Sequence, residues 1–474
     1  MTLKLAGLKR IEAKFDGGAV CTDGGLLILR KADDRAQLSE MASWCIFDPR
    51  RPDLIKHQLV DLFRQRIYAI AAGYEDCNDA ALLCRDAMHL LAVGKDPELG
   101  HRLASQPGLS RFESWADETS NAALQKLLVH QYVRRFKKPP KVIRLAMDTS
   151  CDEAFGYQQL SFYNAFYQCY CYVPLFILTD DGFPLCALLR PGNENVLNDA
   201  VRMLKLVLHE LRLAWPGVKV ELTADAGFNS PEVFEFCEKN NVRYFIGVGT
   251  HSGLAYHAED LVKKCKQEFD EFGFRSPELK KYAALVNEND RKRAWRQREE
   301  RIRFSTKEEG RMQEHFEDEL HVRKYGEFKY QSREWSKERR FIFRVDYTSQ
   351  GPDTRFVVTN SESGKPRRLY DEKYCRRSRC ENWIKDLKTY LKCDRTSCQE
   401  FDANQFRLLL HTFAYILIWD IRKKAQLQEM TLHSFQLQFL KVGVLVRLTD
   451  RNIRLHLASG HPWQSDFRRA WNTA

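Results

Sequence analysis

The stretch "YCRRSRCENWIKDLK", residues 374–388, combines a helical repeat with an unusual set of charges. Successive residues of an α-helix turn by about 100°, so side chains at offsets of 0, 3, 7 and 14 lie within about 60° of one another. One narrow helix face therefore carries a glutamate among cations, which indicates a site that handles phosphates. The side chains on this face are Tyr374, Arg377, Glu381 and Lys388.

A second stripe on the same helix is apolar and predicts that the helix packs on a core, with the polar face at its margin. The surrounding region is basic, since residues 364–397 hold 11 Lys and Arg against 5 Asp and Glu, in a chain of net charge +11. A basic surface is often only solvated. Around a glutamate it favours a polyanionic partner, with nucleic acid the leading candidate. The apolar stripe consists of Trp383, Ile384, Leu387 and Leu391.

Length and composition indicate a globular protein, because 474 residues with 44% hydrophobic content suffice for two or three domains and a large core. The most apolar segment, residues 406–421, is interrupted by His411 and Asp420, so we expect no membrane span. The N-terminal residues lack the apolar core of a secretory signal, which predicts a cytoplasmic protein with reduced cysteines. Cys375 with Cys380 and Cys393 with Cys398 come nearest to zinc-ligand spacing, but ordinary packing is the favoured interpretation.

The chain changes character at the segment "KKPPK", residues 137–141. Residues 1–140 show apolar residues at helical spacing and predict a mainly α-helical region. Residues 141–250 predict the order β(β-β)αβαβ, a mixed sheet with crossover helices, in which residues 166–192 form two long strands around an Asp-Asp-Gly turn. The fold class is therefore α/β.

Residues 251–352 are dense in alternating charges and predict an insertion domain, either a solvent-facing excursion or a functional lid. A strand pair over 339–348 and 354–360 precedes the helix predicted over 374–388, and a long apolar helix over 401–421 follows that helix. Residues 353–474 are therefore expected to complete the core and to add C-terminal helices.

Three acidic residues stand out by position, because Asp148 and Asp225 each end a predicted strand and Glu381 lies on the helix predicted over 374–388. Strand ends converge on a cleft in open sheets, so these carboxylates can meet although they are remote along the chain. Clustered carboxylates need cations, and hard oxygen ligands suit Mg²⁺ or Mn²⁺. Two such ions about 4 Å apart support phosphoryl displacement, which cuts or joins DNA. A lone aspartate at a strand end is more often a loop cap, so the inference depends on the set.

The sequence also resembles a known family. The spacing of Tyr374, Arg377, Glu381 and Lys388 resembles the Y-(2)-R-(3)-E-(6)-K signature of DDE transposases of the insertion-sequence 4 group. The segment "DAGF", residues 225–228, resembles their companion motif. Segments such as "DGGLLILRKAD" (23–33), "LRPGN" (189–193) and "RFVVTN" (355–360) are similar to the insertion-sequence 1380 family within that group.

This resemblance implies a ribonuclease H-like catalytic core interrupted by an insertion domain, acting on the terminal inverted repeats of a mobile element and on target DNA. It implies that two Mg²⁺ or Mn²⁺ ions are bound by Asp148, Asp225 and Glu381. It also implies that Tyr374, Arg377 and Lys388 contact the DNA near the cut. We further expect a homodimer in the synaptic complex, a nucleoid-associated location, and sequence recognition by residues 1–140.

Two local features qualify the resemblance. The family pattern places a further acidic residue and often a histidine soon after the first aspartate, whereas this chain has Ser150 and Cys151 there and no histidine. Asp152, four positions on, is expected to be a loop residue. Trp295 and Trp335 lie among arginines, where an indole could stack on an extruded base, or could instead cover a small local core. Two alternative functions stay open: a ribonuclease H-like nuclease that never joins strands, and a domesticated DNA-binding protein.

Overall fold

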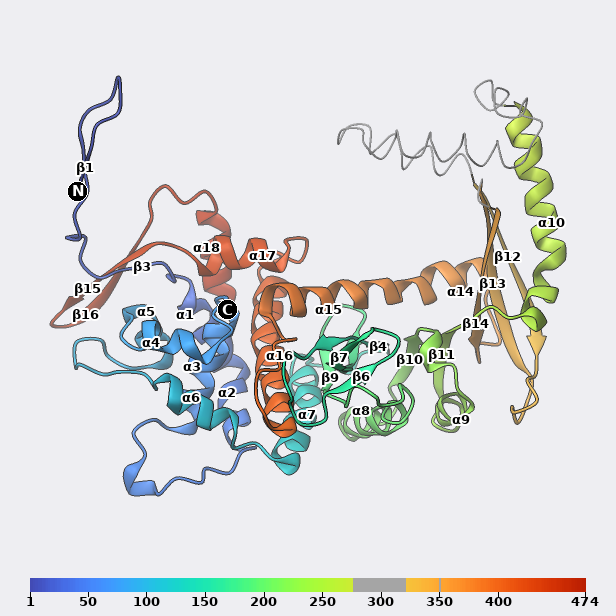
Figure 1. Cartoon of the computed structure of the whole chain (residues 1–474), viewed down its shortest axis with the longest axis horizontal. Coiled ribbons are helices and arrows are strands. Elements are labelled where there is room, and N and C mark those ends of the chain that lie inside the picture. The colour runs from blue at the N-terminus through green and yellow to red at the C-terminus, as the bar shows by residue number, and fades with distance from the viewer. Residues whose placement is uncertain (276–320, 349–350) are drawn as a thin grey trace.

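The computed structural model describes residues 1–275, 321–348 and 351–474. Trp295, one of the two predicted stacking residues, lies outside this part of the chain. Within it, a large mixed sheet runs through the molecule, with the N-terminal helices at one end of the long axis and β12–β14 at the other (Figure 1). The predicted α/β class is confirmed in this form, as a large mixed sheet with many helices.

The central sheet has eight strands in the order β12-β13-β14-β11-β10-β4-β8-β9. Three neighbouring strands, β4, β10 and β11, are parallel, and every other pair is antiparallel. Parallel strands require crossover connections, and helices supply them here. The strands are β4 (Val142–Thr149), β8 (Leu175–Thr179), β9 (Pro184–Leu188), β10 (Lys219–Ala224), β11 (Val242–Val248), β12 (Val322–Tyr330), β13 (Arg339–Thr348) and β14 (Gly351–Thr359).

The crossover helices are α8 (Ala200–Ala214) and α9 (Pro231–Lys239), so the predicted order β(β-β)αβαβ is confirmed. The start of α9 follows from its sequence, because the Ser230 hydroxyl accepts a hydrogen bond from Glu232 N at 3.2 Å and proline occupies the first helical position. The Asp-Asp-Gly turn between β8 and β9 is also present, with Gly182 at φ +87°.

The predicted long strand before that turn is wrong, because the chain breaks at Val173–Pro174 and enters a different sheet. Residues on the N-terminal side of the break form a separate small sheet of three strands in the order β5-β7-β6. Proline lacks the N–H that a central strand must donate, which explains the break. The small sheet consists of β5 (Asp152–Glu153), β6 (Phe162–Asn164) and β7 (Cys169–Tyr172).

The N-terminal region is helical as predicted, but its core is continuous with that of the sheet. Helix α7 packs on β9, and α3 packs on the C-terminal helix α16. The predicted boundary at residue 140 is therefore not a break in the hydrophobic core. The N-terminal elements are β1 (Thr2–Leu3), β2 (Ile11–Glu12), β3 (Val20–Cys21), α1 (Leu26–Ala36), α2 (Leu38–Ser43), α3 (Leu59–Ala71), α4 (Ala80–Leu83), α5 (Ala87–Val93), α6 (Gln106–Glu113) and α7 (Glu118–Val133).

The C-terminal part begins beyond β14 and returns to the N-terminal region, where β15 pairs with β3. Helix α16 is the predicted apolar helix and is almost wholly buried. No helix among the described residues is long and apolar enough to cross a membrane. The elements are α14 (Pro366–Glu372), α15 (Ser378–Leu391), α16 (Phe401–Lys424), α17 (Leu432–Phe435), β15 (Val444–Thr449), β16 (Asn452–Leu457) and α18 (Gln464–Thr473).

The predicted insertion, residues 251–352, is tied to the core in the part that the structure describes. It begins with α10 (Ser252–Arg275), which packs on β12 and β13. Those two strands extend the central sheet through β14, so the predicted boundary at residue 352 falls inside β14. The predicted pairing of the strands over 339–348 and 354–360 is confirmed as β13 with β14.

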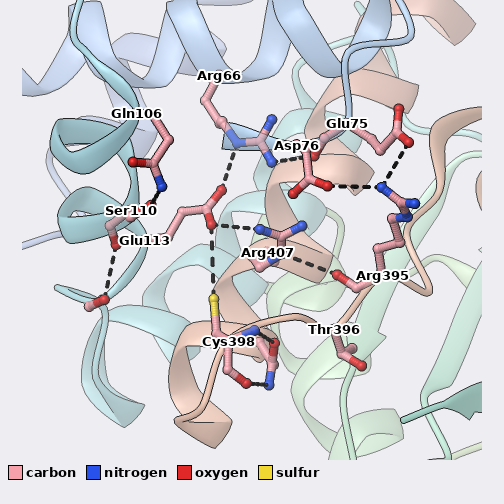
Figure 2. Close-up of polar contacts among 12 residues, drawn as sticks. Arg66, Glu75, Asp76, Gln106, Ser110, Glu113, Arg395, Thr396, Cys398 and Arg407 are labelled. Carbon is pink, nitrogen blue, oxygen red and sulfur yellow. Dashed lines mark hydrogen bonds and ion pairs between the residues drawn. The ribbon is translucent and has the colours of Figure 1, made fainter. Parts of the chain in front are cut away.

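A buried charge network joins the N-terminal helices to α16 (Figure 2). Glu113, at the end of α6, accepts a hydrogen bond from Arg66 Nε at 2.6 Å and another from Arg407 Nη1 at 2.8 Å. All three side chains are at most 3% exposed. Burial alone would raise the pKa of Glu113, but the two guanidinium groups outweigh it and lower that pKa to about 2.

Replacing Glu113 tests this network. Glu113→Gln leaves two buried arginines without their carboxylate and should lower the free energy of unfolding by about 3–5 kcal/mol at neutral pH. The folded-state pKa lies below the ordinary 4.5, so the carboxylate's contribution is full above about pH 4.5 and is lost as the pH falls towards about 2. Urea unfolding across this range measures both effects.

The matched control is Glu259→Gln, which breaks the exposed pair between Glu259 and Lys263 within α10. It should change the free energy of unfolding by less than about 1 kcal/mol. Equal effects of the two substitutions would contradict a special role for the buried network.

Candidate active site

Strand register brings two of the predicted carboxylates together. In the parallel pair β4–β10, Met147 lies opposite Ala224, and the next residue on each strand is an aspartate. Asp148 and Asp225 therefore leave the sheet side by side at the carboxyl ends of their strands. Asp225 then begins a short 3-10 helix, Ala226–Phe228, where its side chain accepts a hydrogen bond from Gly227 N at 3.0 Å.

The third carboxylate comes from α15, which packs over β4. Residues 374–388 were predicted to form one helix, but they consist of a 3-10 turn, Tyr374–Arg377, followed by α15. The helix buries its apolar stripe as predicted: Ile384, Leu387 and Leu391 are at most 6% exposed. Glu381 lies in its first turn with a half-exposed side chain.

Arg377 links the carboxylates directly. Its Nη1 lies 3.2 Å from Asp148 Oδ2, and its Nη2 lies 2.7 Å from Glu381 Oε1. One guanidinium therefore bridges a residue at a strand end to a residue on a helix more than 230 positions later in the chain. Asp148, Asp225 and Glu381 all raise the pKa of Arg377, which places that guanidinium among all three acidic groups.

The charge at Asp148 is only partly compensated. Burial raises the pKa of Asp148 to about 6; Arg377 opposes the rise, whereas Asp225 and Glu381 add to it. Near neutral pH the carboxylate is thus ionised at a cost to the fold. The remaining acceptor capacity and the excess of negative charge are the properties that a divalent cation requires of its ligands.

Tyr374 is half-buried beside these groups. Its hydroxyl lies over Gly247 of β11, so closely that a Cβ at that glycine would lie 2.6 Å from Tyr374 Oη and 3.1 Å from Ala226 N. Burial raises the pKa of the Tyr374 phenol, Arg377 lowers it and Asp225 raises it. Tyr374 thus lies over the carboxyl-terminal part of β11, close enough to Arg377 for the two groups to influence each other's charge.

Lys388 points to the loop that follows Asp148, and not away from the protein. Its ammonium donates hydrogen bonds to Ser150 Oγ at 3.1 Å and to the carbonyl oxygen of Cys151, and lies 3.3 Å from Asp152 Oδ1. Asp152, expected in a loop, is a fully buried residue of β5. Burial raises the pKa of Asp152 to about 7, and Lys388 opposes that rise.

Trp335 lies at the opposite edge of the sheet. Arg340 pairs with Thr359, and Thr359 pairs with Phe245, so the β12–β13 turn lies beside the amino end of β11. Asp148 and Asp225 lie instead at the carboxyl ends of β4 and β10. The indole stacks on Phe341, with ring centroids 5.8 Å apart. It packs as part of a local core, and its position gives no support to the predicted stacking on an extruded base.

A cleft of about 540 Å³ opens beside Asp148 and Glu381. Its lining includes Lys385, Lys388 and Lys392, which successive turns of α15 bring to one side. Lys385 and Lys392 were not singled out from the sequence. The signal was present as a spacing of seven residues on one helix, but the basic stretch offered many other lysines and arginines.

The comparisons with known proteins agree with this geometry. The family model described as transposase DDE domain group 1 matches residues 3–473, almost the whole chain. The chain belongs to this family of DDE transposases. A transposase of this family is a metal-dependent enzyme that binds and cleaves DNA. The cluster of carboxylates is therefore a candidate site for this activity.

No curated protein matches the transposase sequence. Among solved structures, the transposase is similar to the piggyBac transposase in a cryo-EM structure of its synaptic complex with hairpin DNA. That similarity has a TM-score of 0.36 and 10% sequence identity, and it covers 89% of this chain and 80% of the other. At this score no conclusion about function follows from it.

The raised pKa of Asp148 predicts a gain in stability when the charge is removed. Because the folded state holds its proton more tightly, the free energy of unfolding falls as the pH rises from about 4 to about 6. In metal-free buffer, Asp148→Asn should therefore stabilise the transposase by on the order of 1–3 kcal/mol at pH about 8, and by much less at pH about 4. Urea unfolding in the presence of a chelator measures the difference.

Asp450→Asn, a change of an exposed turn residue, is the control and should stay within about 0.5 kcal/mol of the wild type at both pH values. A loss of stability in Asp148→Asn at pH about 8 would show that the Asp148 carboxylate is fully compensated by its neighbours.

Gly247 should be sensitive to a single added methyl group. In Gly247→Ala the new Cβ overlaps Tyr374 Oη, so the tyrosine must move away from Asp225 and Arg377. We expect DNA cleavage to fall by at least about 10-fold, with a loss of about 1–3 kcal/mol in stability. Gly249→Ala is the matched control, because nothing lies within 4 Å of a Cβ there. Equal cleavage by the two variants would contradict the positioning role of Tyr374.

Proposed function

We propose that this transposase acts on the terminal inverted repeats of an insertion sequence similar to the insertion-sequence 1380 family. It cleaves the DNA at the ends of the element and joins the freed 3′-hydroxyl groups to target DNA. The observation that carries the proposal is the link from Asp148 through Arg377 to Glu381, with Asp225 beside them, at the edge of a sheet. A ribonuclease H-like core is proposed for the part of the sheet built from β4, β8–β11 and their crossover helices.

Two divalent ions, Mg²⁺ or Mn²⁺, are proposed as cofactors, with Asp148, Asp225 and Glu381 as their protein ligands. When bound, such ions supply activation of the attacking oxygen and charge neutralisation at the leaving oxygen.

Arg377 has two roles in this proposal. In the metal-free chain it is the counter-ion of Asp148 and Glu381, and it thereby holds α15 in place over β4. When these carboxylates gain another cation, the guanidinium is released from them and can donate two parallel hydrogen bonds to a DNA phosphate. Tyr374 limits how far the arginine can move, because the phenol packs against it.

The lysines that line the cleft have two proposed roles, which are DNA binding and positioning of the loop that follows Asp148. Lys385 and Lys392 line the cleft, and they are proposed to contact DNA phosphates. Lys388 is proposed to act mainly through the loop after Asp148, since its ammonium is engaged by Ser150, Cys151 and Asp152. The Lys388 side chain is 23% exposed. Through this exposed part, Lys388 is also proposed to contact DNA.

Sequence recognition is assigned to residues 1–140, and a homodimer is proposed because two element ends must be held together. The location proposed is the cytoplasm, at the nucleoid. These assignments are supported by the resemblance of the sequence to insertion-sequence transposases and by the helical N-terminal region.

The decisive variant is Glu381→Gln. It keeps the size of the side chain but removes its charge and one acceptor oxygen, so it should reduce Mg²⁺-dependent cleavage of inverted-repeat DNA by at least about 100-fold while leaving DNA binding intact. Nicking of end-labelled fragments and gel-shift titration measure the two properties. Glu372→Gln, at the exposed pair with Arg368, is the matched control and should cleave like the wild type. Cleavage by Glu381→Gln at the control rate would exclude Glu381 as a ligand.

Two further outcomes separate the alternatives. A pre-cut end carrying a 3′-hydroxyl should be joined to target DNA, and its release without joining would favour a nuclease that only hydrolyses. A wild-type protein that binds the inverted repeats but never cleaves them with Mg²⁺ or Mn²⁺ would favour a domesticated DNA-binding protein.

A further inference from the structure

Three cysteine side chains meet next to the loop that follows Asp148. Cys151 directly precedes β5, and Cys169 and Cys171 lie two residues apart on β7, so their side chains point to the same face of the small sheet. Pairing of β5 with β7 sets Asp152 opposite Tyr172 and Glu153 opposite Cys171, which brings Cys151 to that face. None of the three belongs to the cysteine pairs whose spacing attracted attention in the sequence.

The distances among the sulfur atoms match those of a metal site. Cys151 Sγ lies 3.7 Å from Cys169 Sγ, and the Sγ atoms of all three cysteines lie within 4.8 Å of one another. In a tetrahedral site with Zn–S bonds of about 2.3 Å, neighbouring sulfur atoms are about 3.8 Å apart. The three thiols are therefore already arranged to bind one ion with little movement.

We propose that Cys151, Cys169 and Cys171 bind a Zn²⁺ ion through their three sulfur atoms. Thiolates are soft ligands that select zinc over Mg²⁺ and Mn²⁺, which prefer carboxylate oxygens. On binding, each thiol gives up its proton to solvent. Cys171 is buried while Cys151 and Cys169 are partly exposed, so the ion has solvent on one side and the fourth ligand is water.

The zinc ion would stabilise the backbone close to the carboxylates that are proposed to be catalytic. It joins the end of the loop at residues 149–151 to β7, while Lys388 holds the same loop from α15. The backbone after Asp148 is then fixed from two sides. Residues 155–170, which connect β5 to β7, carry many exposed aromatic side chains, Tyr157 and Phe166 among them, and so have little apolar packing of their own. A metal cross-link is a suitable way to hold such a segment.

This inference does not depend on the proposed function, because metal content is measured without DNA. The transposase is purified under reducing conditions without chelators, and its zinc content is determined by mass spectrometry. We expect one zinc ion per chain, removable by a strong chelator. Replacement by Co²⁺ should give the near-ultraviolet charge-transfer absorption of cobalt–thiolate bonds together with the visible bands of a tetrahedral site.

Each cysteine is then replaced in turn. Cys151→Ser, Cys169→Ser and Cys171→Ser should weaken zinc binding by more than about 100-fold, beyond the about 10- to 100-fold that loss of an outer partner costs. Cys84→Ser is the matched control, because Cys84 is also partly exposed, donates only to Ala81 O and lies outside the cluster. Asp225→Asn should keep its zinc while losing cleavage, which separates this site from the carboxylates.

Three results would overturn the inference. The first is a folded wild-type chain that contains no zinc and gives no cobalt–thiolate absorption. The second is full zinc retention in all three serine variants. The third is a disulfide between Cys151 and Cys169 in the protein as isolated from reducing cytoplasm, detected by mass spectrometry after thiol alkylation. The cobalt spectrum of the wild type keeps the test valid even where a variant fails to fold.

Discussion

The parallel pairing of β4 with β10 is the constraint on which the site depends. Because Met147 and Ala224 are opposite one another, the chain must place the carboxylates of Asp148 and Asp225 at adjacent strand ends. Like charges held so close destabilise the fold unless cations offset them. Arg377 offsets part of this repulsion by bridging Asp148 to Glu381. Burial nevertheless raises the pKa of Asp148 to about 6, and Asp225 and Glu381 add to the rise. Pairing of the strand backbones thus brings the carboxylates together, and the neighbouring cations neutralise their negative charge only in part.

The same region separates two kinds of donor. Carboxylate oxygens gather where β4, β10 and α15 meet, and cysteine sulfurs gather at the start of β5 and on β7. Lys388 lies between them, since it contacts the loop that connects Asp148 to Cys151. Hard and soft donors select different metal ions, so neighbouring sites can be filled independently. Lys388 holds the segment directly after Asp148, and a zinc ion at the proposed cysteine site would hold the same segment from the other side.

The sequence was informative where local periodicity carried the signal. Helical spacing predicted α15 with its buried Ile384 and Leu387, and strand and turn patterns predicted the order from β4 to β11. It was less informative where tertiary contacts decide. The break at Pro174 sends β7 into a separate sheet, and only the pairing of β7 with β5 brings Cys151 to Cys169 and Cys171. Likewise, the inward direction of Lys388 and the packing of Trp335 on Phe341 depend on partners that are remote in sequence.

The most direct test of the central claim is a crystal structure of the protein soaked with Mn²⁺, examined by anomalous diffraction. Shared binding by the carboxylates predicts manganese peaks beside Asp148, Asp225 and Glu381, with the guanidinium of Arg377 displaced from Asp148. Manganese bound elsewhere, with Arg377 still bridging Asp148 and Glu381, would contradict the claim that these three side chains form one metal centre.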